Sequence, residues 1–227
     1  MADAKRDKRF PNCARCPYPR KDRACTSPKG KGPADCPTLR HRGLSREIFE
    51  TLSPEEMRFS CMAAAQEYAC YPDRDKPATK PRIVEIVEFA KRMRYARLGL
   101  VFCGGAMKEA GIVQTILETN GFTVVSVMCK AGGIPRDAYF PPEGDTHPTG
   151  PACNPKFQAQ LANMAEVDFN IVLNLCVGHD SLALKNLEAP ATVLAVKDRV
   201  TGHNPLAPIY LYDSYYRFLQ HPLPDPE

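Results

Sequence analysis

The chain has 227 residues, ten cysteines and a formal net charge of +4. This length allows one sizeable α/β domain with a small appendage. No apolar run approaches the roughly 18–20 residues that span a bilayer, which excludes membrane-spanning classes. The charged N-terminus has no apolar segment behind it, so we expect no secretory signal and a cytoplasmic protein with reduced cysteines. In such a compartment, closely spaced cysteines favour metal or thiol chemistry over disulfides.

The first 46 residues differ in composition from the rest of the chain. They carry thirteen Lys or Arg against four Asp, a net charge of +9, which leaves −5 for the remainder. Between Phe10 and Gly43 the only large apolar side chains are Phe10, Tyr18 and Leu39. Such a segment buries too little surface to offset its ordering entropy. We therefore predict a module over residues 1–44 that is disordered or held by something other than a core.

Helical signals follow in residues 45–97, which we predict to be a helical connector packed on the core. Ser53-Pro54 followed by two glutamates is typical of a helix start, with Pro at the first helical position. It predicts a helix over about residues 54–68. A second amphipathic pattern, with Ile83, Ile86, Val87 and Ala90 on one face, predicts another from about residue 81.

Strands and helices alternate in residues 98–227. Short apolar runs predict strands over residues 98–102, 122–128, 169–175 and 192–196, with helices over about 104–120, 155–166 and 179–187 and a short helix near 205–220. Strands that are apolar along their whole length indicate a parallel sheet covered on both faces. The prediction is a small open parallel sheet of about four strands flanked by helices, with flavodoxin- or Rossmann-like layering, and a long Gly- and Pro-rich loop over residues 130–155.

Four N-terminal cysteines have the number and spacing of a closed metal site. Cys13 and Cys16 are two residues apart, and Cys25 and Cys36 complete the four ligands of a tetrahedral structural zinc site. Metal binding would supply the folding energy that this segment cannot obtain from a core. The alternatives are four unrelated thiols in a disordered tail, or an iron–sulfur cluster, although the spacings match neither common ferredoxin pattern. Zinc is the favoured ligand.

A second set of cysteines follows the predicted strands. Cys103 and Cys129 come just after the first two strands, Cys176 comes at the end of the third, and Cys153 precedes a helix capped by Asn154. Ligands of open α/β folds bind at the carboxyl edge of the sheet, and helix N-termini stabilise thiolates. These cysteines therefore predict a site for an iron–sulfur cluster or reactive thiols. The alternative is that they are small buried hydrophobes, which is how we interpret Cys61 and Cys70.

Several polar residues are expected at the same edge. Lys130, beside Cys129, and His179, just after Cys176, are the candidates to tune or assist a thiolate, so the candidate catalytic set is Cys129, Cys176, Lys130 and His179. We expect two further stretches to reach this edge, Lys197-Asp198-Arg199 and His203-Asn204-Pro205. Each alone is weak evidence for a functional site, because charged loops after strands are usually solvated. The backbone around Gly178 would direct further N–H groups there.

Five stretches of sequence resemble the motifs of one family: Phe102-Cys-Gly-Gly, Ser126-Val-Met-Cys-Lys, Cys153-Asn-Pro, Leu175-Cys-Val-Gly-His-Asp-Ser-Leu and Val196-Lys-Asp-Arg-Val-Thr-Gly-His-Asn-Pro. This is a family of uncharacterised bacterial and archaeal metal-binding proteins, a domain of unknown function described as having four N-terminal cysteines that form a zinc-binding domain. The resemblance implies zinc at Cys13, Cys16, Cys25 and Cys36. It implies no reaction, substrate or pathway.

Three functions are compatible with these patterns. The first is an enzyme or redox protein that uses Cys103, Cys129, Cys153 and Cys176. The second is a metal or sulfur carrier without turnover that uses the same residues. The third is a nucleic-acid-binding module, because a zinc segment at net +9 suits phosphates. Only Phe10 and Tyr18 are available there for base stacking, which disfavours the third function.

Overall fold

The computed structural model describes residues 10–73, 75–139 and 150–225. Its internal contacts divide the chain into two units, Met1–Cys61 and Met62–Glu227. The prediction of three segments, 1–44, 45–97 and 98–227, stays a prediction. In the described residues no helix is both long enough and apolar enough to cross a membrane.

The described part of the first unit has short helices and no buried core. It contains η1 (Cys13–Arg15), η2 (Arg20–Asp22), α1 (Pro37–Arg40) and α2 (Arg42–Glu50), and no residue between Phe10 and Cys61 is buried. α3 (Pro54–Ala69) begins at the predicted position and crosses into the second unit. Ser53 and Glu56 cap it reciprocally: Ser53 N–H donates to Glu56 and Glu56 N–H donates to the Ser53 hydroxyl.

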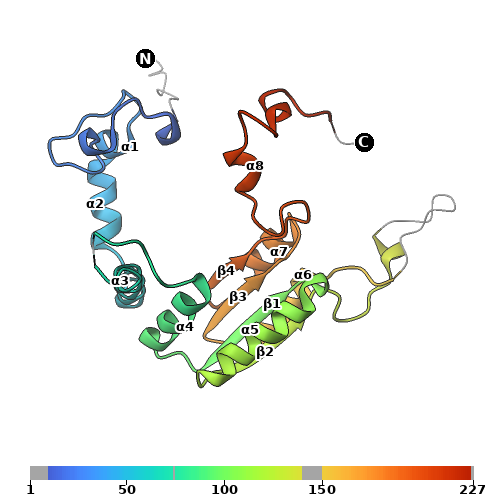
Figure 1. Ribbon diagram of the computed structural model, residues 1–227. Coiled ribbons are helices and arrows are strands. Elements are labelled where there is room, and N and C mark those ends of the chain that lie inside the picture. Colours follow the sequence, from blue (N-terminus) through green and yellow to red (C-terminus); the bar gives the residue numbers. More distant parts are fainter. Residues whose placement is uncertain (1–9, 74, 140–149, 226–227) are drawn as a thin grey trace, which may run out of the picture. The chain divides into compact units, whose positions relative to one another are not determined.

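The second unit is built on a four-stranded parallel sheet (Figure 1). Its strands are β1 (Arg97–Phe102), β2 (Thr123–Met128), β3 (Phe169–Leu173) and β4 (Ala191–Ala195), in the order β2-β1-β3-β4. β3 is buried along its whole length, and β1 everywhere except its first residue, whereas the edge strands are partly exposed. A central strand of a layered sheet is covered on both faces, which explains its continuous apolar sequence. The predicted α/β class and parallel sheet are confirmed.

Helices cover both faces of this sheet. α4 (Arg82–Met93) precedes it, α5 (Met107–Thr119) connects β1 to β2, α6 (Pro155–Met164) connects β2 to β3, and α7 (His179–Asn186) connects β3 to β4. Right-handed crossovers place α5 on one face and α6 and α7 on the other, and α6 and α7 do contact each other. The short η3 (Gly104–Ala106) lies between β1 and α5, and η4 (Arg136–Ala138) lies in the long loop after β2. The tail contains α8 (Ala207–Tyr210) and η5 (Arg217–Gln220).

Two sequence interpretations need correction. The third strand ends at Leu173 rather than residue 175, because Asn174 adopts a left-handed backbone with φ 54°. Cys176 therefore lies in the turn after the strand and not at its end. Cys70 is buried as expected, and its thiol donates to the Glu85 carboxylate at 2.7 Å. Cys61 is exposed, so its interpretation as a packing residue is wrong.

Candidate functional site

Cys103 and Cys129 occupy neighbouring positions at the carboxyl edge of the sheet. Phe102 pairs with Met128 in the ladder between β1 and β2, and each cysteine is the next residue. The Cys129 N–H donates to the Phe102 carbonyl at 2.8 Å and continues this pairing. Their side chains are 7% and 2% exposed, respectively. The strand register thus makes the two thiols neighbours, because β1 and β2 are parallel, equally long and paired from end to end.

Cys153 joins the same cluster from the far end of the long loop. Its Sγ atom lies 3.5 Å from the Cys129 Sγ atom, and the next backbone N–H, that of Asn154, donates to the Cys129 carbonyl at 2.7 Å. Asn154 then caps α6 by accepting from Phe157 N–H. The loop therefore returns to the end of β2 and places a third thiol there, partly exposed, next to a buried one.

The charge partner of Cys103 comes from the loop after β4. The Lys197 ammonium donates to the Cys103 Sγ atom at 2.5 Å, and the Gly105 N–H donates to it at 3.4 Å. Burial acts to raise the pKa of the Cys103 thiol, but Lys197, the Gly105 N–H and a hydrogen bond from the Cys129 thiol outweigh burial and lower this pKa from its ordinary value. Cys103 is the thiol of this cluster that is stabilised as a thiolate.

Cys129 is in the opposite electrostatic situation. Burial raises the pKa of the Cys129 thiol to about 12, and the neighbouring thiols Cys153 and Cys103 act in the same direction. The Gly104 N–H, 3.4 Å from the Cys129 Sγ atom, acts to lower this pKa. Cys129 therefore keeps its proton and donates it in a hydrogen bond to Cys103. Two adjacent thiols with pKa values displaced in opposite directions are typical of a functional site.

Cys176 lies apart from these three. Its Sγ atom is 3.8 Å from the Arg199 guanidinium, and among the described residues no hydrogen bond joins it to another thiol. Within the described ranges, the side chains of Lys130 and His179 likewise form no hydrogen bond to a thiol. The N–H groups of Gly178 and Ser181 donate to the Asp180 carboxylate, which occupies the start of α7. The contacts to thiols come from Lys197 and Arg199 instead.

Two buried amide side chains complete this edge. The Gln158 amide nitrogen donates to the carbonyls of Phe102 and Val127, at 3.1 and 2.6 Å. Phe102 directly precedes Cys103, and Val127 lies two residues before Cys129. Asn174, 2% exposed after β3, has a buried Oδ1 atom without a hydrogen-bond partner. In this strand order the direction of winding reverses between β1 and β3, where ligands of open α/β sheets bind. Cys103 and Asn174 flank that position.

Sequence reasoning missed Gln158 and Asn174 and gave Lys197 little weight. Both are polar residues at positions where the sequence pattern expects buried apolar ones, Gln158 on a helix and Asn174 at a strand end. That mismatch could have indicated them, because buried polar groups need hydrogen-bond partners. In the sequence, Lys197 did not differ from any other lysine that follows a strand, so nothing indicated a contact with a thiol. Which thiol it reaches depends on the spacing of β4 from β1, two strands away.

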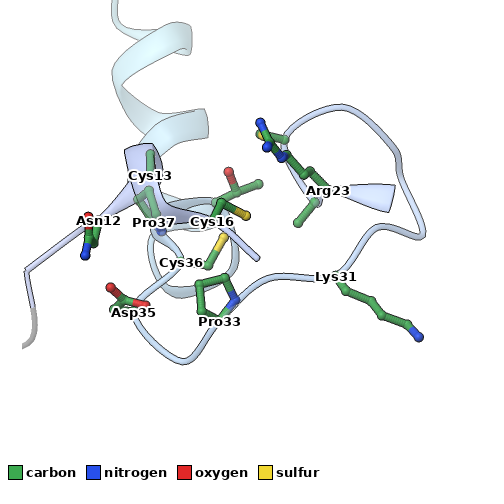
Figure 2. Close-up of a pocket in the computed structure, with 12 residues that line it drawn as sticks. Asn12, Cys13, Cys16, Arg23, Lys31, Pro33, Asp35, Cys36 and Pro37 are labelled. Carbon is green, nitrogen blue, oxygen red and sulfur yellow. The ribbon is translucent and has the colours of Figure 1, made fainter. Parts of the chain in front are cut away.

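The four N-terminal cysteines line one cavity of about 90 Å³ in the first unit (Figure 2). A single tight turn, closed by the Cys16 N–H on the Cys13 carbonyl, holds the first pair. Gly32 packs against Cys36, because a Cβ atom there would lie 2.6 Å from the Cys36 Sγ atom. Figure 2 shows the sulfur atoms of Cys16 and Cys36 directed toward each other in that view, and Arg23 and Lys31 also line the cavity.

The donor chemistry of this cavity suits zinc, while the side chains are not arranged around a single point. Four thiols on one cavity are the ligand set of a closed tetrahedral site. Among the residues that the structure describes, no three Cys, His, Asp or Glu side chains are grouped closely enough to hold a metal ion. All ten cysteines are free thiols. Binding zinc would therefore require the cysteine side chains to turn inward.

The fold and the edge together define a parallel α/β protein with a cysteine cluster at the carboxyl ends of its strands. The chain belongs to the family described as "Protein of unknown function (DUF1847)", whose model matches residues 36–194. It is 40% identical over 170 residues to "Uncharacterized protein MJ0455" of Methanocaldococcus jannaschii, an alignment that covers 74% of this chain and 84% of that protein. No solved structure matches the chain. The family match includes the four edge cysteines and, of the N-terminal four, Cys36 alone.

Proposed function

We propose that the protein performs thiol-based redox or sulfur chemistry at the carboxyl edge of its sheet, with Cys103 as the nucleophile. The observation that carries this proposal is the pairing of the Cys103 sulfur with the Lys197 ammonium and the Gly105 N–H. A thiolate is the reactive form of cysteine, and a nearby cation with a backbone N–H is the usual means of stabilising it. An ordinary packing cysteine needs neither.

Each neighbour has a defined role in this chemistry. The Cys103 thiolate forms a bond to an electrophilic sulfur of a disulfide or persulfide substrate, and the bond from that sulfur to its leaving thiolate breaks. The leaving thiolate takes a proton from solvent. Lys197 and Gly105 orient the Cys103 sulfur before attack, and the protonated Cys129 thiol donates to it. Asn174, with its buried free carbonyl oxygen beside this position, is available to accept from a substrate N–H or O–H.

The test is the pH dependence of alkylation, followed at each cysteine of the full chain by mass spectrometry. Because its pKa is lowered, Cys103 should be alkylated at pH values where the cysteine of a disordered reference peptide is still protonated. Replacing Lys197 by Met should raise the Cys103 midpoint by about 1–3 pH units, the usual effect of an opposite charge at contact distance. Lys185→Met, at an exposed lysine of α7, is the matched control and should leave it unchanged. An unshifted midpoint in Lys197→Met would refute the proposal.

An iron–sulfur cluster on the same cysteines is the competing outcome. Anaerobically purified protein that contains iron and acid-labile sulfide, both lost in Cys103→Ser, would replace the thiol proposal. Colourless protein that is free of iron and has an alkylatable Cys103 would support the thiol proposal. The two results exclude each other at the same residue.

We also propose that Cys13, Cys16, Cys25 and Cys36 bind a structural zinc ion. The support is that the four thiols line one cavity in a unit where no described residue is buried. Zinc binding, worth about 10–16 kcal/mol in zinc-finger peptides, would supply the missing folding energy. Purified protein should contain one zinc per chain, and Cys16→Ser should lose it and become sensitive to protease before residue 61. Cys61→Ser, at an exposed cysteine, is the control; retained zinc in Cys16→Ser would refute this assignment.

A further inference from the structure

We infer that Cys129 and Cys153 form a redox-active dithiol that closes reversibly to a disulfide and so links the segment just before α6 to the end of β2. The inference rests on the proposed function, thiol chemistry at this edge, and adds the pair of residues that donates electrons. It assigns separate tasks to the three clustered thiols: Cys103 attacks the substrate, whereas the other two cysteines exchange two electrons.

The geometry places these two sulfurs next to each other without a bond between them. Their Sγ atoms are 3.5 Å apart, so a disulfide bond needs an approach of about 1.5 Å. The backbones are already adjacent, since Asn154 N–H donates to the Cys129 carbonyl at 2.7 Å. Because that bond joins the two backbone segments in the reduced protein, the backbone at Cys129 and Cys153 needs little movement when the disulfide forms.

The two thiols differ in their access to solvent, and this difference orders the reaction. Cys153 is partly exposed, whereas Cys129 is 2% exposed. Cys103, at 7% exposed, is also less accessible than Cys153. A small disulfide oxidant that is not bound at the site as a substrate therefore meets Cys153 first, and Cys129 is the resolving thiol. The Gly104 N–H, 3.4 Å from the Cys129 Sγ atom, is placed to stabilise negative charge on that sulfur as it attacks.

Electrostatics favours the same order. Among the causes that raise the Cys129 pKa are the hydrogen bond and the charge of Cys153. Once the Cys153 sulfur is bonded to an oxidant it carries no charge, so the contribution of that charge disappears. The opposing Gly104 N–H remains. The Cys129 thiol thus becomes easier to deprotonate when Cys153 has already reacted.

The reaction with a low-molecular-weight disulfide, R–S–S–R, balances as follows. The Cys153 thiol loses its proton and its sulfur bonds to one sulfur of the oxidant; the S–S bond breaks and one RS⁻ leaves, taking up a proton. The Cys129 thiol then loses its proton and its sulfur attacks the Cys153 Sγ atom, which releases the second RS⁻ as RSH. Two electrons and two protons pass from the dithiol to R–S–S–R, giving two RSH and the protein disulfide.

Cys103 is the competing partner for Cys129, because the two are also in contact. Its sulfur already accepts from the Lys197 ammonium and the Gly105 N–H, and disulfide formation would give up both contacts. The Cys153 sulfur has no such donors among the described contacts. We therefore expect Cys129 to pair with Cys153.

The experiment is oxidation of the full chain with oxidised glutathione, followed by alkylation and peptide mapping without reduction. The expected result is a linked peptide of Cys129 with Cys153, reversed by a dithiol reductant and absent in Cys153→Ser. Cys61→Ser, at an exposed cysteine of the other unit, should form the link as the wild type does. Failure to find the link, or a dominant Cys103–Cys129 link, would overturn the inference.

The same samples separate this inference from the proposed function. The alkylation profile of Cys103 is measured again in Cys153→Ser, where the dithiol cannot close. If Cys103 keeps its lowered midpoint while the wild type forms no Cys129–Cys153 link, the inference fails and the proposed function stands. If the link forms but Cys103 titrates like an ordinary thiol, the dithiol stands and the nucleophile assignment fails.

Discussion

Replacing Gln158 by Met removes the amide that joins the ends of β1 and β2 and keeps the volume of the side chain nearly constant. Gln158 is fully buried on α6, and its amide nitrogen donates to the carbonyls of Phe102 and Val127. Cys103 follows the first carbonyl directly. The substitution therefore tests whether a polar contact beneath the thiols contributes to the stability of the sheet edge.

The expected cost follows from the bonds that are lost and those that remain. A buried hydrogen bond contributes about 0.5–1.5 kcal/mol net, and an acceptor left without a partner costs about 1–3 kcal/mol. Phe102 keeps the bond to its carbonyl from Cys129 N–H. The Gln158 Oε1 atom has no partner, so removing it offsets part of the loss. We expect Gln158→Met to lower the free energy of unfolding by about 1–2 kcal/mol.

Urea unfolding followed by circular dichroism measures this change, provided that the slope of the transition is unchanged. Gln160→Met on the same helix is the matched control, because Gln160 is exposed and surface changes usually stay within about 0.5 kcal/mol. If the two variants have the same free energy of unfolding, the bridging amide does not stabilise the edge and the reasoning is wrong.

Two further changes test local features by the same unfolding measurement. Gly99→Ala should destabilise the protein by about 1–3 kcal/mol, because its Cβ atom would lie 2.2 Å from the Asn170 Oδ1 atom in the core. Gly111→Ala, on open helix surface, is the control and should be neutral or stabilising. Equal effects of the two substitutions would contradict the close packing of Gly99 against Asn170. Asn154→Ala removes the cap that accepts from Phe157 N–H and should cost about 1 kcal/mol. An unaltered midpoint would show that this cap contributes nothing.

The strands of the second unit could be predicted because each is coded locally. β3 is apolar at every position except Asn170 and is buried throughout, as expected of a central parallel strand. Since parallel strands end at one edge, the neighbouring positions of Cys103 and Cys129 followed from the strand limits alone. The approach of Cys153 did not follow from strand limits, because it depends on where a loop of more than twenty residues returns.

The end of β3 and the partner of Cys103 could not be read from the sequence, for two different reasons. Asn174 turns the chain with a positive φ angle, which Asn tolerates better than most residues but does not require. Consequently an apolar run that continued to Leu175 overstated the strand. Lys197 reaches Cys103 from two strands away. Only the strand order determines that contact, and local patterns do not specify it.

The two cysteine sets differ in what holds them, and that difference assigns them different chemistry. The N-terminal thiols lie in a unit in which no described residue is buried, so the metal that they bind would also have to organise the fold. A tetrahedral zinc site with four thiolates has no open position for a substrate. The edge thiols lie at the end of a sheet that has a buried core of its own, since β3 is buried throughout and β1 everywhere except its first residue. Cys103 and Cys129 can therefore change their protonation and bonding while the scaffold stays in place, which is the condition that a reactive thiol needs.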